Sequence, residues 1–168
     1  MLDDAGNPTS LNLKYGSVNT FHVQSTHPGP DADGSYSYNK ELLNSYLNAG
    51  PAARNLPRTN SFVTMSGIPY ARYDVYVYFS SDAAERIGNV TDGATTYNFS
   101  TLGSSAIGRP NALFRQTTDR TGVFPPANYA IFNGETGRSL TITVNALGSD
   151  DQWLGIAGFQ VVDTSAPR

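Results

Sequence analysis

The chain has 168 residues, of which 39% are hydrophobic and 15% are charged, and its formal net charge is −3. This length suits one domain with a sizeable buried core. The negative charge argues against nucleic-acid binding, which needs a basic surface to neutralise phosphates.

The chain contains no cysteine, which excludes a disulfide framework and thiolate chemistry. No apolar run approaches the roughly 20 residues that span a bilayer, so membrane insertion is not expected. With few charges, the polar surface must be made by Ser, Thr, Asn, Gly and Tyr. This composition is typical of an extracellular β-protein whose partner is a neutral ligand rich in hydroxyl groups. For a protein that looks secreted, the absence of cysteine favours a bacterial over a eukaryotic source.

The first part of the chain predicts two short strands, a long loop and a helix. Alternating residues predict strands over 11–15 and 18–23. Residues 24–38 are rich in Pro, Gly and Asp, and a loop of this length is usually functional or disordered; its tyrosines Tyr36 and Tyr38 favour a functional loop. Helical spacing of apolar residues predicts a short helix over 39–48.

The stretch 73–79 alternates and predicts a central strand. Val75 and Val77 fall on its core face, while Tyr76 and Tyr78 fall on a face that points toward something other than bulk water. Further strands are expected at 62–66, 87–91, 95–100, 113–118, 129–132, 140–145 and 155–162. Many short strands at such intervals predict an all-β fold, an antiparallel sandwich or barrel with one short helix.

The histidines and aspartates offer weak metal-site candidates. His22 and His27 would need a third ligand, such as Asp31 or Asp33, and two unrelated histidines are the simpler interpretation. The aspartates in turns, among them the pair at 150–151, fit either a structural calcium ion or solvated turns. The few glutamates are not placed to form a glycosidase pair.

The aromatic residues are the third candidate, because sugar rings stack on aromatic rings and sugar hydroxyls bind amide, carboxylate and guanidinium groups. The lone tryptophan, Trp153, follows Asp151 and Gln152 in a loop just before the last predicted strand. The remaining residues that could complete a sugar site are Tyr36, Tyr38, Tyr76, Tyr78, Tyr129, Arg86 and Asn128. The alternative is that Trp153 only caps the core. No nucleophile, P-loop or dinucleotide motif is present to support catalysis.

Between residues 60 and 162 the chain resembles a module of large secreted bacterial proteins. The stretches that carry the resemblance include Tyr73-Asp-Val-Tyr-Val-Tyr-Phe79, Ala127-Asn-Tyr-Ala-Ile-Phe132 and Gly155-Ile-Ala-Gly-Phe-Gln-Val-Val162. More broadly it is similar to the galactose-binding-like jelly rolls, which include many carbohydrate-binding modules. The resemblance implies a jelly-roll sandwich and glycan binding. It also implies a structural calcium ion near the N-terminus and last strand, for which Asp3, Asp4 and Asp163 are the candidates.

These observations predict a single β-sandwich module over residues 1–168, cut from a longer secreted protein. The expected function is non-catalytic binding of a plant or microbial polysaccharide, which holds an appended enzyme on its substrate. The module itself is expected to be a tethered monomer. The alternatives are a structural or adhesive spacer of a cell-surface protein and, more distantly, a small hydrolase that uses Asp82, Asp150 or Asp151. An exposed Trp153 favours binding, whereas a buried one favours the spacer.

Overall fold

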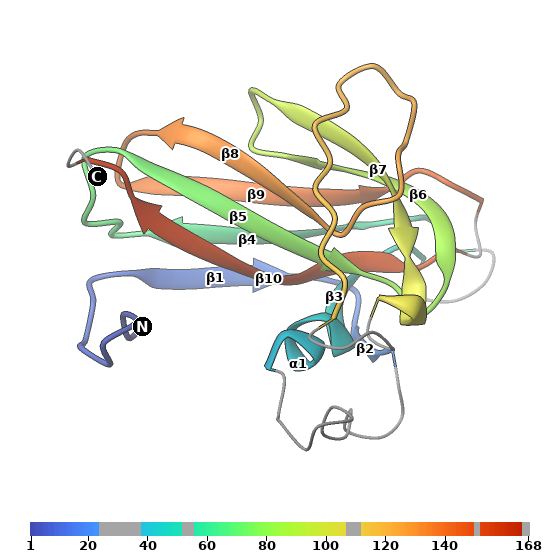
Figure 1. Cartoon of the computed structure of the whole chain (residues 1–168), viewed down its shortest axis with the longest axis horizontal. Helices are drawn as coiled ribbons and strands as arrows, with labels where there is room; N and C mark the ends of the chain where they lie inside the picture. The colour runs from blue at the N-terminus through green and yellow to red at the C-terminus, as the bar shows by residue number, and fades with distance from the viewer. Residues whose placement is uncertain (24–37, 52–55, 107–111, 150–151, 166–168) are drawn as a thin grey trace.

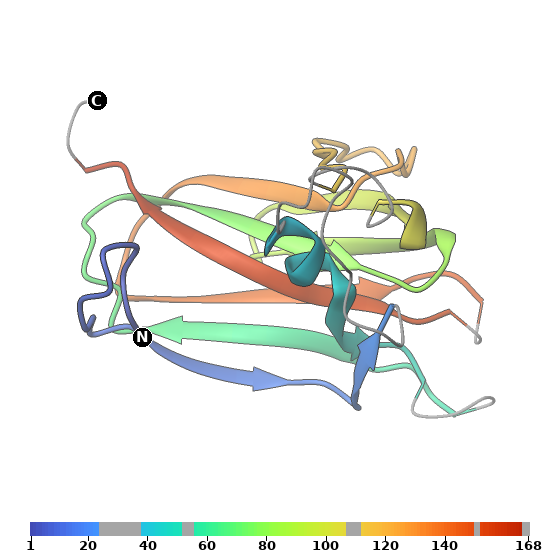
Figure 2. The ribbon, with the colours of Figure 1, turned by 60° about the horizontal axis from the view of Figure 1, so that its bottom comes forward.

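The computed structural model describes residues 1–23, 38–51, 56–106, 112–149 and 152–165. Two antiparallel sheets lie face to face and enclose the main core, as Figures 1 and 2 show. This arrangement confirms the predicted all-β sandwich. Of the loop predicted over 24–38, residues 24–37 lie outside the described residues, and the last residue, Tyr38, begins the helix α1. Tyr36, Asp151 and the side chain of Tyr38 also lie outside the described residues.

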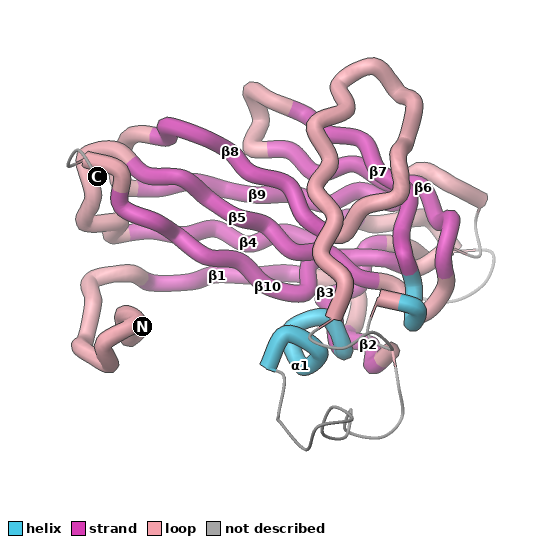
Figure 3. Tube along the Cα trace, in the orientation of Figure 1, coloured by secondary structure: helices cyan, strands magenta, loops and turns pink. Residues whose placement is uncertain are grey.

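Each sheet has five strands, and their order in space differs from their order in the chain. The first sheet runs β1 (Asn12–Gly16), β4 (Asn60–Ser66), β9 (Ser139–Ala146), β6 (Ala84–Thr91) and β7 (Thr96–Leu102). The second sheet runs β2 (Thr20–His22), β3 (Ser45–Ala49), β10 (Leu154–Asp163), β5 (Tyr73–Ser80) and β8 (Tyr129–Glu135). Figure 3 shows the helices of the described chain as two short segments, α1 (Tyr38–Asn44) and the single 3-10 turn η1 (Gly103–Ser105).

The alternation along β5 sets the two faces of the second sheet as predicted. Tyr73, Val75, Val77 and Phe79 are fully buried between the sheets. The ring of Phe79 stacks on Phe99 of β7, with 3.7 Å between the ring centroids. Burial of one such side chain stabilises the fold by about 1.5–3 kcal/mol, so this strand fixes which face of the sheet turns inward.

The opposite face of β5 is covered by α1 and by the segment that leads into β8. The ring of Tyr78 lies 5.5 Å from the ring of Phe114 and 5.9 Å from that of Tyr129. Ser80 Oγ donates a hydrogen bond to the backbone carbonyl of Leu43 in α1 at 2.6 Å. Tyr78 is half-buried, so this face is partly shielded from bulk water there, and its cover consists of the chain's own side chains.

The helix predicted over 39–48 is wrong in its second half. α1 ends at Asn44, and the next five residues form β3, which pairs with both β2 and β10. Leu47 packs against the core, so Tyr46 and Asn48 lie on the opposite face of the strand. Strand pairing outweighs local helix propensity here, because it satisfies backbone groups and buries side chains on both faces.

The strand predicted over 113–118 is also wrong. This segment forms one isolated bridge, between Gln116 and Tyr129, and otherwise runs without a strand partner. The buried side chain of Asn128 holds it instead: Oδ1 accepts a hydrogen bond from the backbone N–H of Arg115 at 2.8 Å, and Nδ2 donates one to the carbonyl of Leu113 at 2.7 Å. Backbone hydrogen bonds between Arg115 or Thr117 and residues 128–129 complete this attachment.

The loop that follows this segment is organised by the carboxylate of Asp119. It accepts hydrogen bonds from the backbone N–H groups of Thr121, Val123 and Phe124, at 2.8, 2.8 and 2.9 Å. These donors, Thr121 foremost, lower the pKa of Asp119 to about 2. Because folding lowers this pKa, the stabilisation by the carboxylate is complete above about pH 4 and is lost as the pH falls through the folded value.

We expect a carbon-13 NMR titration of the Asp119 carboxyl group to have its midpoint near 2. Replacement of Asp119 by alanine should accelerate amide exchange at Thr121, Val123 and Phe124 and leave the strands unchanged. A midpoint close to the ordinary value of 3.8 would contradict this account of the loop.

Candidate functional site

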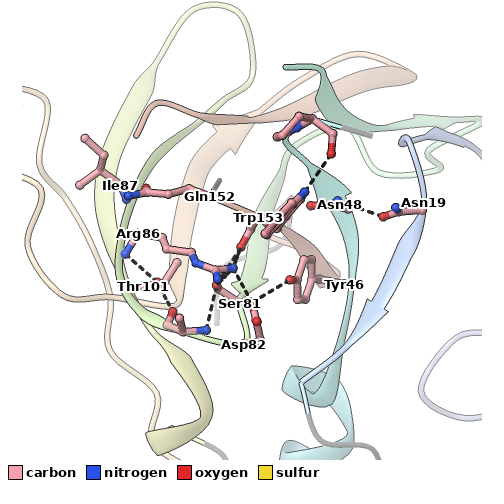
Figure 4. Close-up of polar contacts among 12 residues, drawn as sticks. Asn19, Tyr46, Asn48, Ser81, Asp82, Arg86, Ile87, Thr101, Gln152 and Trp153 are labelled. Carbon is pink, nitrogen blue, oxygen red and sulfur yellow. Dashed lines mark hydrogen bonds and ion pairs between the residues drawn. The ribbon is translucent and has the colours of Figure 1, made fainter. Parts of the chain in front are cut away.

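Trp153 lies just before β10, at the end of the second sheet, where the loop after β5 meets β3 (Figure 4). Its side chain is half-buried. This exposure lies between the exposed state that would favour ligand binding and the buried state that would favour a purely structural role. The indole Nε1–H donates a hydrogen bond to the carbonyl of Pro51 at 2.8 Å, which fixes the orientation of the ring. The ring is therefore available to a ligand only through its faces and outer edge.

Arg86 of β6 anchors the loops around Trp153. Its Nη1 donates hydrogen bonds to the carbonyl of Trp153 at 2.6 Å and to Ser81 Oγ at 3.2 Å, and it forms an ion pair with the carboxylate of Asp82. The guanidinium carbon lies 5.7 Å from the centroid of the Trp153 ring, within cation–π distance. One cation thus joins the loop after β5 to the loop before β10.

A pocket of about 260 Å³ opens beside this anchor. Residues from four separate stretches of the chain line it: Asn19, Phe21, Tyr46, Asn48, Asp82 and Trp153. The pairing of β2 with β3 and of β3 with β10 brings these stretches together. We call it the Trp153 pocket.

The amide of Asn48 is the most informative polar group in the Trp153 pocket. The residue is 2% exposed, and its Nδ2 donates a hydrogen bond to Asn19 Oδ1 at 2.9 Å. Its Oδ1 is buried and has no hydrogen-bond partner; Figure 4 shows this oxygen on the side toward Trp153. A buried acceptor without a partner costs about 1–3 kcal/mol, and because this oxygen is covered, a ligand donor would reach it only after a neighbouring side chain had shifted.

Asp82 supplies a carboxylate with one oxygen held and the other free. Its Oδ1 accepts a hydrogen bond from the phenol of Tyr46 at 3.3 Å and faces Arg86, whereas its Oδ2 has no partner among the described residues. Its side chain is 33% exposed, so Oδ2 can meet a ligand. Burial, followed by the negative charge of Asp82, raises the pKa of Tyr46 well above its ordinary value, so the phenol remains a donor at any physiological pH.

Aromatic rings form the apolar part of the Trp153 pocket. Phe21 is 44% exposed, and its ring lies 5.8 Å from that of Tyr46 at an angle of 42°. With Trp153, they place three rings beside two amides and a carboxylate. Apolar surface with a few placed polar groups is the usual make-up of a small-ligand site.

The structure brings only part of the predicted site together. Trp153 and Arg86 are in contact, and Asp82, which the sequence offered as a calcium or hydrolase candidate and not as a sugar-binding residue, joins them. Gln152 turns away from the pocket, because its Oε1 accepts a hydrogen bond from the backbone N–H of Ile87 at 3.3 Å.

The candidates on β5 and near β8 do not line the Trp153 pocket. Tyr78 is covered by its neighbours and donates a hydrogen bond to Gln160 at 3.1 Å. Tyr129 packs against Tyr78, and both the oxygen and the nitrogen of the Asn128 side-chain amide form hydrogen bonds with backbone groups. Tyr76 is half-buried on the same face of the sheet as Tyr78. The structure therefore does not bring these four residues to Trp153, and their part in ligand binding stays a prediction.

Four lining residues were missed by sequence reasoning: Asn19, Phe21, Tyr46 and Asn48. The helix prediction over 39–48 concealed the strand alternation that puts Tyr46 and Asn48 on one face. The signal available was that two-residue spacing. Phe21 stands opposite Tyr46 in the ladder between β2 and β3, a register that no local pattern reveals.

The predicted calcium ligands lie at a different place on the molecule. Asp3, Asp4 and Asp163 line one groove beside the N-terminus. Asp3 already accepts hydrogen bonds from Ala5 and Asn7, and no group of three or more His, Cys, Asp or Glu side chains suited to a metal ion occurs among the residues that the structure describes. Calcium binding stays a prediction, which thermal unfolding with and without calcium would test. His27, Asp31 and Asp33 lie outside those residues.

Comparisons of the chain with protein-family models, curated proteins and solved structures find no match. None of the helices described has the length and apolar character that crossing a membrane requires.

Proposed function

We propose that this chain is a non-catalytic carbohydrate-binding module that holds a secreted bacterial enzyme on a polysaccharide, and that the Trp153 pocket is its glycan site. The observation that carries the proposal is the make-up of the Trp153 pocket, in which three aromatic rings lie beside the partly exposed carboxylate of Asp82 and the amides of Asn19 and Asn48. A sugar residue has the matching chemistry, since its C–H faces pack on rings and its hydroxyl groups donate to amide and carboxylate oxygens.

The charges around the pocket favour a neutral ligand. Asp82 is paired with Arg86, so the two charges largely cancel at the site. Binding that depends on ring contacts and hydrogen bonds should change little with ionic strength. The small area available in a pocket of about 260 Å³ supports weak binding, which a module tethered to an enzyme can use through effective concentration.

Affinity electrophoresis tests the proposal. The protein is run in native gels that contain soluble xylan, mannan, β-glucan, pectin or galactan, beside the variants Phe21→Ala and Tyr15→Ala. Phe21 and Tyr15 are both exposed aromatic residues on strands, but only Phe21 lines the Trp153 pocket. We expect one polysaccharide to slow the protein, Phe21→Ala to weaken the affinity by about tenfold, and Tyr15→Ala to leave it unchanged.

Three other results would change or replace the proposal. Equal slowing of both variants would place the glycan site elsewhere. No slowing in any gel would favour the structural spacer, for which the bond from Trp153 to Pro51 and the anchoring of its loop by Arg86 are the supporting observations. Release of reducing ends from the retarding polysaccharide, lost in Asp82→Asn, would instead support a hydrolase.

A further inference from the structure

Half of β10 lacks a neighbour on one of its sides. β5 pairs with β10 over residues 155–163, whereas β3 pairs with it only over 154–156. β3 and β5 lie on opposite sides of β10. On the side of β3, no backbone hydrogen bond from another described segment reaches residues 158–163. Backbone N–H and C=O groups of this stretch that point away from β5 are therefore open to a further strand.

The outer edges of the two sheets on the opposite side of the sandwich are closed in part by loop segments. Along β7, the N–H groups of Asn98 and Ser100 donate hydrogen bonds to the carbonyls of Asp119 and Pro125. The carbonyl of Tyr129 at the start of β8 accepts one from Thr117. The outer edge of β1 is free, but it is only five residues long and carries Lys14, a residue type that blunts edges. The unpaired half of β10 is thus one of the edges to which no described loop is bonded.

A groove runs between this half of β10 and β1, as two hollows of about 500 and 200 Å³ that share Phe159. Figure 2 shows both strands along the near side of the sandwich. Leu140 aside, every partly buried side chain that packs on the main core lines this groove, namely Leu11, Leu47, Tyr70, Phe159 and Val161. The core is therefore incompletely covered along this side. We call this feature the β10 groove.

The larger hollow of the β10 groove is acidic. Asp3, Asp4 and Asp163 line it, and its lining residues include no lysine, arginine or histidine. Three carboxylates without a cationic side chain among them favour a cationic occupant.

We propose that the β10 groove binds an extended peptide segment, which adds a strand to the second sheet beside residues 158–163. The free backbone groups require an extended partner, and the pleat turns its alternate side chains toward the core. Those side chains must be apolar to cover Phe159 and Val161, and a lysine or arginine must lie near Asp163. A second copy of the chain fits less well, because it would bring the same carboxylates to the groove.

A nine-residue peptide with alternating valine and threonine between two terminal lysines is a suitable probe. We expect it to slow amide exchange at the unpaired N–H groups of 158–163 by about tenfold or more at saturation, with no effect on the outer edge of β1. Leu13→Lys should weaken binding about tenfold, because Leu13 lines the groove and is 38% exposed, so its replacement is tolerated by the fold. Asn12→Lys adds the same charge to the other face of β1 and should leave binding nearly unchanged.

Several results would overturn the proposal. One is the absence of protection at millimolar peptide; another is protection confined to other strands. Equal binding of the same peptide with glutamates in place of lysines would remove the electrostatic argument. A dimer in sedimentation velocity that Leu13→Lys dissociates would assign the groove to a second copy of the chain. None of these outcomes involves the Trp153 pocket, so they are independent of glycan binding.

Discussion

Replacement of Gly155 by alanine should destabilise the protein by about 3 kcal/mol. A Cβ at this position would overlap the backbone carbonyl of Leu47, in the neighbouring strand β3. The carbonyl cannot move without separating β3 from β10, and no flexible side chain can absorb the overlap. Because β3 carries Tyr46 and Asn48, the same variant should also lose affinity for the glycan.

Gly158→Ala, three residues along the same strand, is the matched control. Its added Cβ would meet the terminal Cδ1 of Leu42, which can rotate away, and its cost should remain below about 1.5 kcal/mol. Urea unfolding of both variants, followed by Trp153 fluorescence, measures the difference. Equal losses of stability would show that the close contact between β3 and β10 is not the sensitive feature.

Replacement of Arg86 by methionine should cost about 2–3 kcal/mol of stability and also weaken glycan binding. The side chain is 14% exposed, and its removal leaves the carboxylate of Asp82 without its cation. The carbonyl of Trp153 would keep the hydrogen bond from Ser81 but lose the one from the guanidinium. Both loops that border the pocket should then become more mobile.

Arg120→Met is the matched control for Arg86→Met. The guanidinium of Arg120 also lies over a ring, 5.1 Å from the centroid of Tyr97, and donates a hydrogen bond to the Tyr97 phenol at 3.1 Å. Arg120 is exposed and forms no ion pair with another described residue. Loss of its guanidinium should therefore lower the free energy of unfolding by less than about 1 kcal/mol. If the two variants are equally stable, Arg86 does not anchor the site.

The sandwich could be predicted from the sequence because the strand signals are local. The alternation of Tyr73, Val75, Val77 and Phe79 with smaller or polar-tipped residues depends on a period of two that each strand carries by itself. The closing strand was predicted over 155–162 and is found at Leu154–Asp163 for the same reason. The segment 113–118 has the same local appearance, yet the side chain of Asn128 holds it where a strand partner would be.

The pocket could be predicted only in part, because its members meet through pairings between distant segments. Trp153 was identified as a lone tryptophan in a loop between polar residues, a composition signal that needs no partner. Phe21 reaches the pocket only through its register with Tyr46, and Asn48 only through the pairing of β3 with β10. Neither pairing register can be inferred from a short stretch of the sequence.

The most direct test of the glycan-binding proposal is a nitrogen-15 NMR titration of the protein with oligosaccharides from the retarding polysaccharide. Two side-chain probes lie at the pocket, the amide of Asn48 and the indole N–H of Trp153. We predict saturable shifts of both, together with the backbone of Phe21, and no comparable shifts at Tyr76 or Tyr78. Saturable shifts around Tyr76 and Tyr78 with the Asn48 amide unmoved, or no shifts with any oligosaccharide, would contradict the account.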